Sequence, residues 1–312
     1  MHKDAPEVTP FTPPTADQLL AIRVNAGINE LAETERFAHA EPDLVEAIVE
    51  GVGQFAAGEF APLNRKGDLE GAKLENGVVR LPEGFDAAYR AYVEQGWNAI
   101  ASPIAHGGQG LPFTLACNVL ENLGAANMAF TLLPMLSVGA IEALEHHGSK
   151  DQQSKYLPKL VSGLWSGTMN LTEPAAGSDV GALRSTAEPI ESGPHAGKYR
   201  ITGQKIYITW GEHDLAENII HLVLARLPGA PEGSRGISLF VVPKYHVNAD
   251  GSLGSHNDLR CVSLEHKLGI NASPTCVMSY GDNGECIGEL VGHPNKGLAA
   301  MFTMMNNARI NV

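Results

Sequence analysis

The hydrophobic period of this 312-residue chain changes near Trp165, and this change limits the possible folds more than any other feature. Before Trp165, apolar residues recur every three or four positions, which predicts amphipathic helices. After it, short runs rich in β-branched residues are separated by Gly, Pro and Asn, which predicts strands. The helical period returns from Asn295 onward. Helices followed by strands, without regular alternation, favour an α+β fold over a parallel α/β sheet.

Two places in the helical half have the spacing of a capping box. Thr15 with Gln18, and Ser149 with Gln152, each place a hydroxyl three residues before an amide side chain. In a capping box these two side chains bond reciprocally to the free backbone N–H groups of the first turn. We therefore expect helices to begin at both places.

Prolines predict where other helices begin and end. Pro42 suits a first helical turn, and the helix that follows it is expected to end by Pro62, because proline lacks the N–H of an interior helical bond. The helix after Ser149 is expected to stop near Pro158. Two strongly apolar segments, residues 113–123 and 127–145, are predicted to be the central core helices.

The strand-like half contains several short segments separated by turn residues. They are residues 198–202, 205–209, 218–227, 236–242, 262–264 and 275–280. Antiparallel strands at this spacing predict a small barrel or sandwich. A Rossmann-type nucleotide site is not expected, because the glycine-rich run 107–110 lies between two prolines rather than between a strand and a helix.

Composition excludes several classes of protein. A formal net charge of −13 argues against nucleic-acid binding, which needs a basic face. The four cysteines form no CxxC pair and no ligand-like spacing with histidine, so neither disulfides nor a metal site is predicted. Residues 1–6 contain no apolar signal segment, and the apolar stretch 128–141 is too short to span a membrane. A cytoplasmic location is expected.

The run from Met169 to Asp179 has the composition of a ligand-binding loop. It reads Met-Asn-Leu-Thr-Glu-Pro-Ala-Ala-Gly-Ser-Asp, with hydroxyls at Thr172 and Ser178 and a glycine at 177. Glycine lets a ligand approach bare backbone, and proline fixes its own φ. A strand-like segment with another hydroxyl, Thr209, begins near Lys205.

These two segments resemble the flavin-binding signature of the acyl-CoA dehydrogenase family. Further resemblances follow in the order that the family has them. They are the turn 107–112 (Gly-Gly-Gln-Gly-Leu-Pro), the segment 203–209 (Gly-Gln-Lys-Ile-Tyr-Ile-Thr), the segment 290–298 and the closing run 306–309 (Asn-Asn-Ala-Arg). Segments 211–221 and 267–275 resemble the larger bacterial branch, which includes 3-methylmercaptopropionyl-CoA dehydrogenases.

The resemblance implies an N-terminal all-helical domain (residues 1–166), a middle antiparallel β-barrel domain (167–292) and the start of a C-terminal helical bundle (293–312). It also implies FAD, bound at residues that belong to the two segments. The expected FAD-binding residues are Met169, Leu171, Thr172, Gly177, Ser178, Tyr207, Ile208 and Thr209. The expected substrate-binding residues are Ser178, Asn306 and Arg309.

The resemblance further implies oxidation of an acyl-CoA thioester to the 2-enoyl-CoA, as in fatty acid metabolism. The acceptor is expected to be an electron-transfer flavoprotein, and the full-length form a homo-oligomer. The family's catalytic glutamate lies beyond the position of Val312, so we expect most of the C-terminal domain to be missing and this chain alone to be inactive. Glu173 is rejected as the base and interpreted as a structural carboxylate.

Two other interpretations remain open from the sequence. One is an acyl-CoA oxidase on the same fold, which would differ in how oxygen reaches the reduced flavin. The other is a CoA- or flavin-binding fragment or assembly subunit without chemistry of its own.

Overall fold

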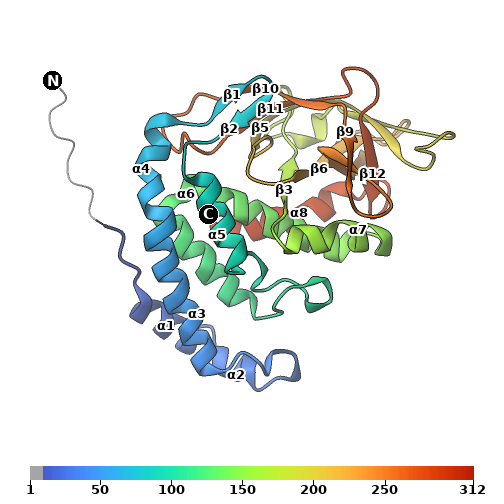
Figure 1. Cartoon of the computed structure of the whole chain (residues 1–312). Helices are drawn as coiled ribbons and strands as arrows, with labels where there is room; N and C mark the ends of the chain where they lie inside the picture. The colour runs from blue at the N-terminus through green and yellow to red at the C-terminus, as the bar shows by residue number, and fades with distance from the viewer. Residues whose placement is uncertain (1–9) are drawn as a thin grey trace, which may run out of the picture.

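The structure, a computed structural model, describes residues 10–312. Residues 1–6, which carried the prediction of no signal segment, lie outside the described residues. The strands gather in one layer and the helices in another, with the longest helix running beneath the sheet (Figure 1). The order of elements is helices, strands and a final helix, so the predicted α+β class is confirmed.

The N-terminal helices pack around one apolar core. Within it, Phe130 stacks on Phe60 with ring centroids 4.4 Å apart and lies 4.7 Å from Phe85. The helices are α1 (Thr15–Val24), α2 (Ile28–Ala32), α3 (Pro42–Phe55), α4 (Ala61–Glu70), α5 (Phe85–Glu94), α6 (Phe113–His147) and α7 (Lys150–Val161).

The two predicted capping boxes have different outcomes. Ser149 accepts a hydrogen bond from the backbone N–H of Gln152 at 3.2 Å, and the Gln152 side chain accepts one from the Ser149 N–H at 3.0 Å. The capping box at Thr15 is wrong, because Thr15 is already the first residue of α1 and Pro14 occupies the cap position. Proline has no side-chain acceptor, so α1 begins without a side-chain cap.

The predicted helix end at Pro62 is also wrong. A π-helical turn at Ala56–Phe60 joins α3 to α4, and α4 continues to Glu70. Pro62 lies in the first turn of α4. The wider π turn shifts the hydrogen-bond pattern just ahead of the proline ring, so the missing N–H interrupts the helix without ending it.

The N-terminal domain is not all-helical, because it contains a β-hairpin. Strands β1 (Lys73–Glu75) and β2 (Val78–Arg80) pair antiparallel. Asn76 and Gly77 form the turn with φ angles of 51° and 82°. Two consecutive positive φ angles define the tight hairpin turn that Asn-Gly favours. This dipeptide was present in the sequence, and it was the signal that the prediction missed.

Helix α6 is the central helix of the molecule. Asn127 has non-helical angles (φ −159°, ψ 87°), so α6 bends where the sequence predicted a break between two core helices. Pro134 and Gly139 do not interrupt it. By length and composition α6 could cross a membrane, yet 72% of its most apolar window is buried in the protein, as in a core helix.

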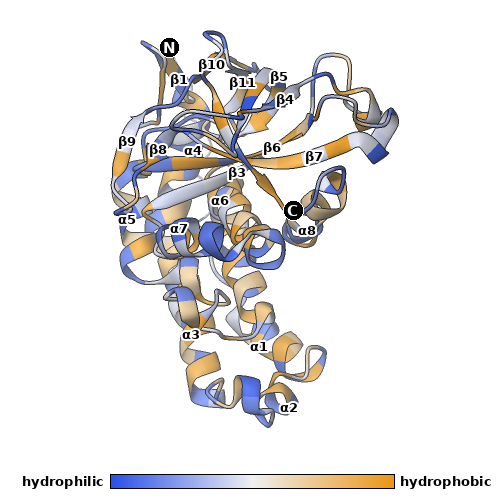
Figure 2. Cartoon of the chain, turned by 90° about the vertical axis from the view of Figure 1, so that its right-hand side faces the viewer, coloured by the Kyte–Doolittle hydropathy of each residue, from blue (hydrophilic) through white to orange (hydrophobic). Residues whose placement is uncertain are grey.

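The β-region forms an eight-stranded sheet in the order β10-β11-β5-β12-β7-β6-β3, and β4 pairs with both β5 and β6. The hydrophobic colouring of β7 in Figure 2 reflects a strand whose residues are all buried. The strands are β3 (Trp165–Asn170), β4 (Thr186–Pro189), β5 (Tyr199–Thr209), β6 (Asn218–Arg226), β7 (Ile237–Pro243), β10 (Leu259–Leu264), β11 (Thr275–Tyr280) and β12 (Ile287–Val291). A separate hairpin contains β8 (Tyr245–Val247) and β9 (Leu253–His256).

The prediction of an antiparallel barrel needs two corrections. The sheet is a path with β10 and β3 at its ends rather than a closed barrel. In addition, β3 runs parallel to β6, from the pair Trp165–Asn218 to the pair Asn170–Val223. Parallel neighbours require a long crossover, and the loop after β3 together with β4 and β5 provides one. β5 is a single strand where two were predicted.

The final helix α8 (Gly297–Asn311) confirms the predicted return to helical structure. It packs along α6, where the Asn307 amide donates to Glu142 at 2.9 Å and His147 shares a hydrogen bond with Thr303 at 2.8 Å. Its first residue, Gly297, packs directly against the backbone of Ser238 in β7, leaving no room for a side chain. Helix α8 therefore contacts both the helical layer, at α6, and the sheet, at β7.

Candidate functional site

The two segments singled out in the sequence lie side by side. β3 ends at Asn170, and the loop that follows it runs along the end of β5. The hydroxyl of Thr168 donates to the carbonyl of Thr209 at 2.7 Å, and the N–H of Ile206 donates to the carbonyl of Thr172 at 2.9 Å. The segments are thus joined by one backbone bond and one bond from a side chain to the backbone, while several of their side chains stay partly exposed.

Glu173 anchors the loop. Its side chain is buried, and its Oε1 accepts from Lys205 Nζ at 2.7 Å and from Ser185 Oγ at 2.6 Å. Its Oε2 accepts from the backbone N–H of Arg184 at 2.6 Å. Burial alone would raise the pKa of Glu173, but Lys205, Ser185 and the Arg184 N–H together hold this pKa below its usual value. Glu173 is therefore ionised and structural, as the sequence analysis interpreted it.

Lys205 is the partner that completes this anchor. Its side chain has no exposed surface, and Nζ also donates to the carbonyl of Leu171 at 3.1 Å. Burial lowers the pKa of Lys205 to about 8, an effect that Glu173 partly offsets. Both side chains are therefore charged at neutral pH. Sequence reasoning placed Lys205 in the motif without giving it a role, and nothing in the sequence pointed to Arg184 or Ser185.

A bulge in β5 turns Tyr207 toward solvent. The register between β5 and β11 shifts between Cys276 and Met278, opposite Tyr207, which has a φ of 58°. Bulges bend a strand and redirect its side chains, often next to functional sites. As a result Tyr207 is 59% exposed although it belongs to the sheet.

The other predicted residues of the two segments fall into two groups. The side chain of Ile208 is 2% exposed and packs in the core of the sheet, so only its backbone could face a ligand. The remaining residues keep at least partly exposed surface. They are the half-buried Met169, Leu171, Thr172 and Thr209 and the exposed Gly177 and Ser178.

The loop beyond Ser178 is held by Arg226. Its guanidinium donates to the carbonyls of Leu183 (2.9 Å), Gly181 and Gly233 (2.8 Å). These bonds fix the short turn after Ser178 against β6. The exposed hydroxyl of Ser178 therefore stands on a loop that is anchored on both sides, by Glu173 and by Arg226.

A buried polar network lies behind the end of β3. The Tyr280 hydroxyl donates to Asn170 Oδ1 at 2.7 Å and lies 3.1 Å from His221 Nδ1. All three side chains are buried. Burial lowers the pKa of His221 to about 3, with smaller contributions from Lys244 and His256, so its imidazole is neutral. The network fixes the residue from which the loop begins.

Asn306 and Arg309 lie apart from this junction. Both are exposed on α8, and no hydrogen bond or ion pair of the described residues joins them to the loop 171–178. The Arg309 guanidinium lies 5.9 Å from the ring centroid of Phe302. Asn306 borders a cavity of about 520 Å³ that Phe113, Glu142 and His147 also line.

Comparison with known proteins connects this geometry to a family. Residues 43–164 match the family model of the acyl-CoA dehydrogenase N-terminal domain, and residues 168–282 match that of the middle domain. The chain belongs to the acyl-CoA dehydrogenase family. It is 49% identical over 302 residues to 3-methylmercaptopropionyl-CoA dehydrogenase from Ruegeria pomeroyi, covering 97% of this chain and 50% of that protein. The predicted similarity to that branch is confirmed.

Two further comparisons resemble this chain, one in sequence and one in fold. A butyryl-CoA dehydrogenase from Syntrophomonas wolfei is 40% identical over 260 residues, which cover 81% of this chain and 42% of the relative. The structure of butyryl-CoA dehydrogenase from Megasphaera elsdenii matches 87% of this chain and 64% of its own chain, with a TM-score of 0.67 and 21% identity. The chain spans about half the length of the curated relatives it matches.

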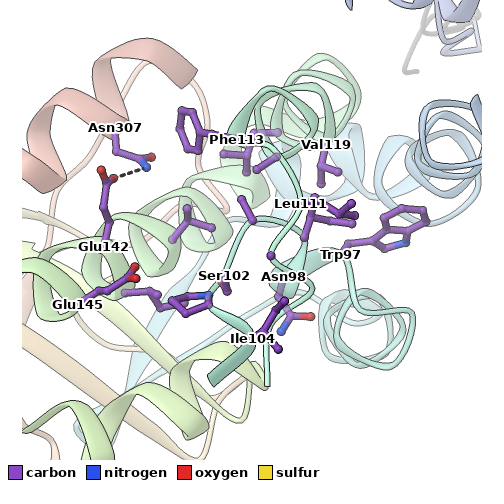
Figure 3. Close-up of a pocket in the computed structure, with 18 of the residues that line it drawn as sticks. Trp97, Asn98, Ser102, Ile104, Leu111, Phe113, Val119, Glu142, Glu145 and Asn307 are labelled. Atoms are coloured by element: carbon purple, nitrogen blue, oxygen red, sulfur yellow. Dashed lines mark hydrogen bonds between the residues drawn. The ribbon is translucent and has the colours of Figure 1, made fainter. Parts of the chain in front are cut away.

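One cavity lies away from the two segments. It measures about 630 Å³, and its lining includes Trp97, Asn98, Leu111 and Phe113, with the Glu142–Asn307 hydrogen bond at one side (Figure 3). None of the predicted site residues lines it. The junction of β3 and β5 remains the place where the predicted FAD-binding residues meet.

Proposed function

We propose that this chain forms the helical and β-sheet parts of an FAD-dependent acyl-CoA dehydrogenase, which oxidises the Cα–Cβ bond of an acyl-CoA thioester to the 2-enoyl-CoA. The observation that supports this most is the direct joining of the two motif segments. Thr172 lies more than thirty residues before Tyr207 and Thr209 in the sequence. The bonds from Ile206 to Thr172 and from Thr168 to Thr209 bring the two segments together.

The exposed groups at this junction suit a flavin ring. Tyr207 offers a largely exposed aromatic side chain, and Thr172 and Thr209 offer hydroxyls for the polar edge of such a ring. Gly177 leaves open space, because an added Cβ would meet only the Thr172 methyl, at 3.7 Å. Bound FAD would supply the hydride acceptor, and the protein would supply placement and electrostatics.

The reaction also needs a base for the α proton and residues that bind the substrate. Glu173 is excluded as the base that removes the α proton, because its oxygens are engaged by Lys205, Ser185 and Arg184. We therefore assign no catalytic base within this chain. Ser178, Asn306 and Arg309 are proposed to contact the substrate.

The wider setting is also part of the proposal. Relatives named as 3-methylmercaptopropionyl-CoA and butyryl-CoA dehydrogenases support an acyl-CoA substrate. We propose an electron-transfer flavoprotein as the acceptor, a homo-oligomeric whole protein, a cytoplasmic location and a division into domains near residues 166 and 292. The acyl-CoA oxidase and the non-catalytic binding subunit remain the rival functions.

Titration with FAD tests the proposal. The chain is expected to quench FAD fluorescence on binding, and Thr172→Ala should weaken binding about fivefold, the effect of losing one hydrogen bond of about 1 kcal/mol. Thr186→Ala is the matched control, because Thr186 is an exposed threonine on β4. Failure of the unaltered chain to bind FAD, or equal weakening by both variants, would overturn the proposal.

A further inference from the structure

We propose that the buried Glu173–Lys205 ion pair is a positioning device that fixes Thr172 against the segment 205–209, so that the ligand site forms only when the pair is intact. This inference rests on the proposed flavin site and assigns roles to two residues that do not themselves touch the ligand. Both side chains are almost completely buried, with exposed fractions of 0% for Lys205 and 7% for Glu173.

The geometry of the contacts supports this role. Lys205 Nζ bonds to residues on both sides of Thr172, namely the carbonyl of Leu171 at 3.1 Å and the carboxylate of Glu173 at 2.7 Å. Thr172 itself accepts from the N–H of Ile206. Two consecutive residues of β5 therefore hold three consecutive residues of the loop. The backbone of Thr172, from which its hydroxyl extends, cannot shift relative to β5 without breaking one of these bonds.

A second support is the packing behind the pair. Ser185, which donates two bonds to Glu173, lies directly against Gly203 of β5, where any side chain would collide with it. β5 thus provides both the lysine that bonds Glu173 and the gap that admits Ser185. The Glu173 carboxylate of the loop is therefore bonded both to residues 184–185, which precede β4, and to Lys205 of β5.

Stability alone does not explain a charged pair at this place. Desolvating two charges costs about as much as their attraction returns, and apolar side chains of similar volume often serve stability equally well. An ion pair does differ from an apolar contact in requiring one alignment of its partners. Its contribution here is therefore to fix the relative position of loop and strand.

A second buried pair, in the connections that follow β5 and β7, provides a matched control. Lys244 Nζ lies 2.5 Å from Glu212 Oε1, and the exposed fractions of these side chains are 9% and 2%. No hydrogen bond of the described residues joins this pair to residues 171–173. Removing it tests what the loss of a buried ion pair does to the sheet in general.

The experiment compares two neutral double variants. Lys205→Met with Glu173→Gln removes the first pair and leaves an amide oxygen for Ser185, and Lys244→Met with Glu212→Gln removes the control pair. Neither leaves an unpaired buried charge, so both proteins are expected to fold, with melting temperatures within a few degrees of each other. Thermal unfolding by circular dichroism checks this first.

Amide hydrogen exchange without FAD then tests the positioning directly. Peptides covering 171–178 should exchange at least tenfold faster in the first double variant and be unchanged in the control. In the FAD titration, the first variant should bind at least tenfold more weakly and the control within twofold of the unaltered chain. Unchanged exchange in both variants, or equal losses of affinity, would overturn the inference. No FAD binding by the unaltered chain would instead overturn the proposed function, while the exchange result would still decide the positioning.

The pH dependence of FAD affinity gives a readout that a purely structural role would not move. Glu173 is the titratable group that faces Lys205, whose pKa burial lowers to about 8. Affinity of the unaltered chain should therefore fall as pH rises from 7 to 9, and that of the first double variant should stay flat. Parallel profiles in the two proteins would contradict the inference.

Discussion

The helical region and the β-region bury different kinds of polar group. Among the described residues, the buried polar side chains before Trp165 are amides and hydroxyls, such as Asn118, Asn122 and Gln153. Within residues 10–312, every buried charged side chain and every buried histidine belongs to the β-region. They are Glu173, Lys205, Glu212, His213, His221 and Lys244. Because buried charges are costly to desolvate, their concentration in one region marks where position matters more than stability.

Glu173 and Glu212 show that not all these charges are equivalent. Burial raises the pKa of Glu212 despite Lys244, whereas additional bonds from Ser185 and Arg184 keep the pKa of Glu173 low. The carboxylate beside the predicted ligand loop is therefore the better satisfied of the two. The Glu173 carboxylate, which anchors the loop, therefore stays ionised to lower pH than the Glu212 carboxylate.

Acidification should cause the largest loss in the free energy of unfolding, and this loss should arise in the β-region. Burial lowers the pKa of both His213 and His221 to about 3, against an unfolded value near 6.5. The unfolded chain therefore binds more protons, and stability present above pH 6.5 is lost as pH falls toward 3, at up to about 3 kcal/mol per pH unit. Urea unfolding between pH 7.5 and 4.5 measures this loss.

The location of the acid effect sharpens the comparison. Amide exchange at pH 5 should show faster opening of β3 and β6 than of α6, whose histidines His146 and His147 lie at its C-terminal end. A free energy of unfolding that stays constant from pH 7.5 to 4.5 would contradict the account. So would earlier opening of α6.

Truncating Phe130, in the apolar core of the helical region, should cause the next largest loss in the free energy of unfolding. Phe130 is fully buried between Phe60, Phe85 and Trp210. Phe130→Ala should lower the free energy of unfolding by about 3–5 kcal/mol, through lost burial and the cavity left behind. Phe302→Ala, at a ring that is 39% exposed, is the control and should cost far less. Equal losses in urea unfolding would show that the helical core is not close-packed.

The smallest effect should come from the helix caps. Ser149→Ala removes a side-chain bond to the Gln152 N–H and should cost about 1 kcal/mol. Thr15→Ala is the matched control, because Thr15 makes no capping bond, and it should change stability by less than about 0.5 kcal/mol. A larger loss at Thr15 than at Ser149 in thermal unfolding would contradict the assigned caps.

Local sequence signals predicted much of the fold, but they failed for features that depend on contacts between distant parts of the chain. The bend at Asn127, the cap at Ser149 and β11 at Thr275–Tyr280 were predicted, because each depends on nearby residues. The Asn76-Gly77 turn was readable but missed. The parallel pairing of β3 with β6 could not be read, because it joins strands separated by a long crossover.

The candidate site was predictable as a set of segments, not as a set of contacts. The family motif placed Thr172 and Tyr207 together, but the exposure of Tyr207 depends on a bulge opposite β11, and the burial of Ile208 follows from the same bulge. The partners of Glu173 lie 11, 12 and 32 residues away along the chain, so no spacing rule identifies them.

The central claim is that ligand binding belongs to the junction of the loop 171–178 with the segment 205–209. Amide hydrogen exchange of the whole chain, compared with and without saturating FAD, tests it most directly. The account predicts slower exchange in these two segments and no change around the cavity lined by Trp97, Leu111 and Phe113. Unchanged exchange at the junction, or slower exchange confined to that cavity, would contradict it.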